Sequence, residues 1–109
     1  MADPNRISAV ATRLMDAYDK PSTPLHAVIA SMRAIVVAEP DASAGVVRVM
    51  LDRVKPDQPA LWDMMTIIGA IYARECGDDS LVLLVQAAAA AQGVALQHFD
   101  VAPPAPGTA

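Results

Sequence analysis

The chain has 109 residues, of which 54% are hydrophobic and only 4% aromatic, and its formal net charge at pH 7 is −4. This length predicts a single domain with one modest core, built from aliphatic side chains and methionine rather than aromatic rings. The acidic balance makes direct nucleic-acid binding unlikely to be the function, because such binding needs clustered Lys and Arg.

Three amphipathic helices are predicted in the first half of the chain, because apolar residues recur there at helical spacing. The first spans 4–19, begins after a polar residue and a proline, and has the stripe Ile7, Val10, Leu14 and Tyr18. The second spans 24–38 and has the stripe Leu25, Val28, Ile29, Met32, Ile35 and Val36. The third spans 42–54 and has the stripe Val47, Met50 and Val54.

Two more helices are predicted in the second half, and both are more apolar. The helix over 59–76 carries two parallel stripes: Leu61, Met64, Ile68 and Ile71 form one, and Trp62, Met65, Gly69, Tyr72 and Cys76 form the other. A helix with two stripes contacts several neighbours, so we expect it to be central. The helix over 79–92, "SLVLLVQAAAAAQ" after Asp79, is apolar nearly all round, which is typical of a core or interface helix.

The predicted fold is therefore all-α, a small bundle of four or five helices arranged as stacked αα-hairpins. One hairpin is expected over 24–54 and a second over 59–92, with the helix over 4–19 packed beside them, and the last two helices at the centre. Residues 1–100 form the predicted domain, and the proline-rich segment 101–109 is expected to be a disordered tail.

The run over 81–92 is too short to cross a membrane. From Leu81 to Ala91 it has eleven residues, about 16 Å of helix against a hydrocarbon core of about 30 Å. Within it, residues 81–85 are large and are expected to fill the core, whereas residues 87–91 are alanines that allow another helix to approach closely.

No catalytic, metal or cofactor site is predicted. The two histidines, His26 and His98, have no acidic residue three or four positions away, and the single cysteine rules out a Cys-x-x-Cys zinc site. Cys76 is expected to be an inert, buried thiol. A lone cysteine also fits a reducing compartment, and the amino terminus lacks the pattern of a signal peptide, so a cytoplasmic location is expected.

Three functions remain open. The leading hypothesis is a non-enzymatic protein-interaction module, a homodimer or an adaptor for a protein partner, and its expected contact residues are Trp62, Tyr72, Leu84, Ala87, Ala88 and Ala91. The second is a carrier or sensor of a small apolar ligand. The third is a nucleic-acid-related regulator, for which Arg48, Arg53 and Lys55 after the acidic turn over 39–45 loosely suggest a helix-turn-helix.

Overall fold

The computed structural model describes residues 3–20 and 22–96. These residues form five helices, α1 (Pro4–Tyr18), α2 (Leu25–Ala38), α3 (Pro40–Leu51), α4 (Pro59–Cys76) and α5 (Ser80–Gln92), and no strand lies among them. The predicted all-α bundle is confirmed. The predicted tail, residues 101–109, lies outside the described residues, as does His98.

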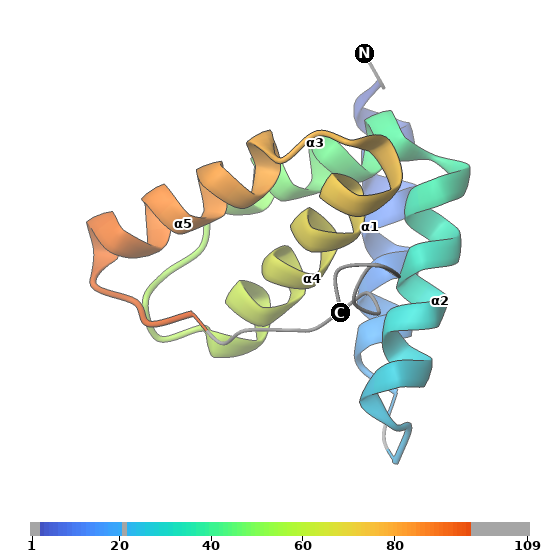
Figure 1. The fold of residues 1–109 in the computed structure, drawn as a ribbon, viewed down its shortest axis with the longest axis horizontal. Helices are drawn as coiled ribbons and strands as arrows, with labels where there is room; N and C mark the ends of the chain where they lie inside the picture. The colour runs from blue at the N-terminus through green and yellow to red at the C-terminus, as the bar shows by residue number, and fades with distance from the viewer. Residues whose placement is uncertain (1–2, 21, 97–109) are drawn as a thin grey trace, which may run out of the picture.

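The helices are arranged in three layers (Figure 1). Helices α1 and α2 lie side by side and run in opposite directions, α3 and α4 form the middle, and α5 lies on the far side of α4. The hairpin of α4 and α5 was predicted. The hairpin predicted for α2 and α3 is not the main packing of α2. Helix α2 packs beside α1, and α3 turns away from α2 and crosses α1.

Local signals explain where most of the helices begin and end. Asp3 caps α1 through its Oδ1 atom, which accepts a hydrogen bond from the backbone N–H of Arg6 at 2.9 Å. Proline occupies the first position of α1, α3 and α4, where its missing N–H costs nothing. Helices α4 and α5 end at Gly77 and Gly93, whose φ angles of 66° and 70° favour glycine.

Helix α3 begins two residues earlier and ends three residues earlier than predicted. Only Glu39 separates α2 from Pro40, so the expected turn over 39–45 is in fact the first turn of a helix. The single linking residue leaves no turn of the helix-turn-helix kind. Val54 is buried as expected, although it follows the helix, and its backbone N–H donates to the carbonyl of Met50 at 2.8 Å.

Helix α4 is the centre of the bundle, as the two stripes predicted. It packs against α2, α3 and α5, and its buried residues occur on nearly all sides of the helix. Met65, Ile67 and Ile68 have no solvent exposure. Trp62 is 1% exposed, and its indole Nε1–H donates to the backbone carbonyl of Lys55 at 3.0 Å, which ties the loop before α4 to the core.

Helix α5 is peripheral rather than central, which corrects the prediction. It packs against α4 and α3, and only Leu81, Val85 and Ala89 are fully buried. Leu83 and Leu84 were expected in the core but are 56% and 44% exposed. A second correction concerns Leu25, which was assigned to the buried stripe of α2 and is 52% exposed because it lies in the first turn.

Salt bridges join helices that are distant in sequence. Glu39, at the junction of α2 and α3, accepts from Arg6 and lies 3.6 Å from Arg13, so both arginines of α1 converge on one carboxylate. Arg33 of α2 contacts Glu75 of α4 at 2.7 Å. The arginine side chains are more than half exposed, so each pair contributes at most about 1 kcal/mol.

Candidate interaction surface

The outward side of α5 is an uncharged, largely apolar surface of the described chain. The buried residues of this helix recur every four positions, so its opposite side faces solvent. Five exposed apolar residues lie on that side, and we call them the α5 face: Leu83, Leu84, Ala87, Ala90 and Ala91. The exposed, polar side chain of Gln86 borders this face. The helix contains no charged residue between Ser80 and Gln92. A surface helix normally carries charges on its solvent side, and α5 does not.

Other exposed large hydrophobic residues do not form a comparable surface. They are divided among three helices, one on α1, two on α2 at opposite ends, and one on α3: Met15, Leu25, Val37 and Val49. Single exposed apolar side chains of this kind are ordinary on soluble proteins. Leu83 and Leu84 differ because they are adjacent and share the solvent side of α5 with exposed alanines and one uncharged polar residue, Gln86.

The six contact residues expected from the sequence do not lie on one surface in the structure. Leu84, Ala87 and Ala91 lie on the α5 face, and Ala88 is half-buried at its edge, where it packs against the core. Trp62 is a core residue with no free surface, and Tyr72 lies in a groove on α4. The sequence reasoning missed Leu83 and Ala90 as surface residues. Leu83 lies four positions before Ala87 and Ala90 lies three positions after it, so helical spacing places all three residues on one side of α5.

Helix α5 is fixed firmly enough to present this face in one orientation. At its start, the Asp78 carboxylate accepts from the backbone N–H of Ser80 at 2.9 Å, a hydrogen bond that lowers the pKa of Asp78. At its end, the N–H of Val94 donates to the carbonyl of Ala89 at 2.8 Å. In the middle, Gly69 of α4 has no side chain, and a Cβ there would lie 3.4 Å from the backbone nitrogen of Val82. The first turn of α5 therefore packs directly on the backbone of α4.

A groove of about 620 Å³ lies where α1, α3 and α4 meet. Its floor includes Gly45, and its sides include Ile7, Arg48 and Tyr72. Arg48 has no ion-pair partner among the residues of the described ranges. Burial raises the pKa of the Tyr72 phenol, and the nearby acidic groups add to this. The phenol therefore stays protonated as a hydrogen-bond donor beside the guanidinium.

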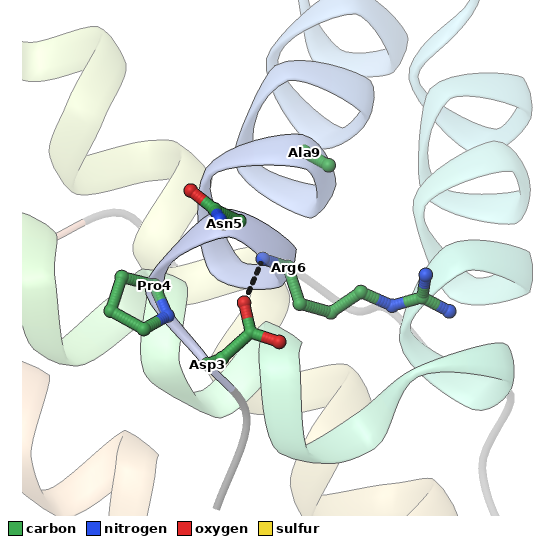
Figure 2. A pocket seen from close by; sticks show the side chains of 5 residues that line it. All are labelled: Asp3, Pro4, Asn5, Arg6 and Ala9. Atoms are coloured by element: carbon green, nitrogen blue, oxygen red, sulfur yellow. Dashed lines mark hydrogen bonds between the residues drawn. The ribbon is translucent and has the colours of Figure 1, made fainter.

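A second hollow, of about 490 Å³, lies at the first turn of α1 and is wide open (Figure 2). Figure 2 shows the Asp3 carboxylate directed at the backbone N–H of Arg6, and the Arg6 side chain extending away from Asp3. Asp3 is therefore engaged in capping the helix, and Arg6 is paired with Glu39. Both charged groups of the hollow therefore stabilise the fold.

The ionisable residues of the described chain do not form a metal-binding cluster. No cluster of three or more His, Cys, Asp or Glu residues that could hold a metal occurs in residues 3–20 and 22–96. The sequence predicted a buried Cys76, but the thiol is exposed, because it belongs to the last turn of α4 and faces away from the core. His26 is exposed on α2, as its position opposite the buried stripe indicated.

A partly buried polar contact links α1 to α4. The Tyr18 hydroxyl donates to Oδ2 of Asp63 at 3.5 Å. Burial raises the pKa of Asp63, and the hydrogen bond from Tyr18 opposes this. Burial also raises the pKa of Tyr18, and the Asp63 charge adds to it. The pair is a structural contact between two helices, and neither group opens onto the α5 face or the groove.

No helix in the described part of the chain combines the length and the apolar character that crossing a membrane requires. Comparisons with protein-family models, with curated proteins and with solved structures found no significant match. The surface of the molecule is therefore the basis for its functional interpretation.

Proposed function

We propose that this chain is a non-enzymatic protein-interaction module that self-associates through the α5 face. One observation carries the proposal: the solvent side of α5 holds two adjacent, half-exposed leucines and three exposed alanines, with no charged residue in the whole helix. Contiguous apolar surface of this kind is usually covered by a partner. A second copy of the chain is the occupant that we propose.

The expected association is weak. Fully burying a leucine contributes about 1.5–3 kcal/mol, and Leu83 and Leu84 have about half of their surface left to bury. Four such leucines in a dimer therefore contribute roughly 3–6 kcal/mol, to which the alanines add less. Association costs about 4–15 kcal/mol in lost translational and rotational freedom. The leucines therefore offset only the lower end of this cost, so we expect a weak dimer that forms toward millimolar protein concentration and dissociates on dilution.

Sedimentation equilibrium of the full chain, from micromolar to millimolar concentration, tests the proposal. We expect a concentration-dependent dimer for the natural sequence and a monomer for Leu83→Glu. Glutamate has a helix propensity close to that of leucine, so α5 stays folded while the face gains a charge. Leu25→Glu is the matched control, because Leu25 is equally exposed, at 52% against 56%, but lies on α2.

Two results would contradict self-association through α5. In the first, the natural chain stays monomeric at every concentration. In the second, Leu25→Glu abolishes the dimer and Leu83→Glu leaves it intact. Circular dichroism at the same concentrations shows that each variant keeps its helical content.

A second candidate function is the binding of a small apolar ligand, and the groove between α1, α3 and α4 favours it. The Arg48 guanidinium and the Tyr72 hydroxyl line the groove together with the Asp41 carboxylate and with apolar side chains, an arrangement suited to a hydrocarbon chain whose polar end reaches the guanidinium. Thermal denaturation with a medium-chain fatty acid tests this function. We expect stabilisation of the natural chain and its loss in Arg48→Gln, while Arg53→Gln, outside the groove, behaves as the natural chain.

A further inference from the structure

The α5 face is divided into a bulky half and a small half. Leu83 and Leu84 occupy its amino-terminal half, and Ala90 and Ala91 occupy its carboxyl-terminal half, with Ala87 between them. Two bulky halves would hold two helices apart, and two small halves would leave a gap between them. A bulky half placed against a small half fills the space evenly, as close packing requires. The face therefore complements itself in one relative direction only.

Charge at the ends of α5 favours the same direction. Asp78 and Asp79 precede the helix, whereas residues 93–96 after it are Gly, Val, Ala and Leu. In a parallel pair, the four carboxylates of the two copies would meet at one end, and like charges at close range repel. In an antiparallel pair, each pair of carboxylates lies beside the uncharged 93–96 segment of the other copy. The dipoles of the two helices also point in opposite directions in that arrangement, so the positive end of each lies beside the negative end of the other.

We infer that two copies of this chain pair through antiparallel α5 helices, related by a twofold axis that passes beside Ala87. The inference rests on the proposed self-association and adds its geometry. Residues equally far before and after Ala87 lie at the same height in the pair, so Leu83 of one copy is level with Ala91 of the other. Leu84 is likewise level with Ala90. A twofold interface requires this reciprocity, in which each contact occurs twice.

The dimensions of the face agree with a small, close helix pair. Alanine at the axis allows the two helices to approach to about 8 Å, the short end of the range for packed helices. The Cα atoms of Leu83 and Ala91 are about 12 Å apart along the helix, at 1.5 Å per residue. Such a contact is much smaller than the roughly 800 Å² per partner of a standard interface. The pair therefore dissociates readily, as expected for the proposed dimer.

Cysteine cross-linking distinguishes the two directions. The exposed natural thiol is first removed by Cys76→Ser, and single cysteines are then introduced in the full chain as Leu83→Cys, Ala87→Cys or Ala91→Cys. Each variant is oxidised alone, and the first and third are also mixed in equal amounts, one of them carrying a mass tag. Ser31→Cys, exposed on α2, is the control for random collision.

The antiparallel pair predicts that Ala87→Cys cross-links with itself. It also predicts that the mixture of Leu83→Cys and Ala91→Cys yields mainly the product that joins one of each, several-fold above either variant alone and above Ser31→Cys. Self-linked Ala91→Cys as the main product would establish a parallel pair and overturn this inference while leaving self-association intact. A dimer in sedimentation without any cross-link on α5 would overturn both, and a monomer at every concentration would refute the proposed function itself.

Discussion

Ser43 provides a direct test of the packing, because replacing it with alanine should stabilise the protein. Its side chain is completely buried in α3, and its hydroxyl oxygen has no hydrogen-bond partner among the described residues. An unsatisfied buried polar group costs about 1–3 kcal/mol. Ser43→Ala removes that cost, and alanine adds up to about 0.5 kcal/mol of helix propensity. The loss of packing around the missing oxygen offsets part of the gain, so we expect about 1 kcal/mol of net stabilisation.

The measurement is the free energy of unfolding in urea, supported by the thermal midpoint. In a domain of this size, 1 kcal/mol corresponds to a rise of about 4–8 °C. Ser31→Ala is the matched control, because Ser31 is an exposed serine in the interior of α2 and reports helix propensity alone. If Ser43→Ala gains no more than Ser31→Ala, or is destabilised, then the hydroxyl has a favourable partner and the reasoning is refuted.

Three further predictions concern polar contacts that join the helices and loops of the fold. The folded-state pKa of Asp63 is raised above 3.8, chiefly by burial. Its ionisation therefore lowers stability at neutral pH, and this cost disappears as the pH falls through the raised pKa. Asp63→Asn, which can still accept from Tyr18, should be more stable at pH 7 in urea titrations, with a gain that vanishes toward pH 3.8. Trp62→Phe loses the hydrogen bond to Lys55 and leaves a small cavity, so urea unfolding followed by circular dichroism should show a loss of about 1–3 kcal/mol. Glu39→Gln should cost below about 1 kcal/mol in low salt, and the difference should shrink in high salt.

The helices that the sequence located best are those with unambiguous local signals. Both ends of α4 were predicted correctly, because Pro59 starts the helix and Gly77 adopts the left-handed conformation that ends it. The start of α3 was misplaced, because Glu39 and Pro40 directly follow α2. An acidic residue and a proline at that point fit a turn as well as a helix start. Only the packing of α3 across α1 distinguishes the two.

The candidate surface was predicted in part, and the rest depends on tertiary structure. A helix that is apolar all round has no periodic signal that says which side is buried, and α5 is such a helix. Its rotation is fixed by α4, where Gly69 leaves room for the backbone of Leu81 and Val82. That contact turns Leu83 and Leu84 toward solvent. The sequence therefore indicated the helix that forms the surface but could not assign its leucines to the outward side.

The outward leucines are the part of α5 that folding alone does not explain. The buried stripe of Leu81, Val85 and Ala89 suffices to hold the helix on α4, and the exposed alanines are accounted for by their high helix propensity. Leu83 and Leu84 are different. Lys, Glu and Arg support a helix nearly as well as leucine and would interact better with water at a half-exposed position. The exposed half of each leucine gains free energy only when another surface covers it. If the stability of the monomer is unchanged in Leu83→Glu while the dimer is lost, the requirement for leucine at this position comes from association and not from folding.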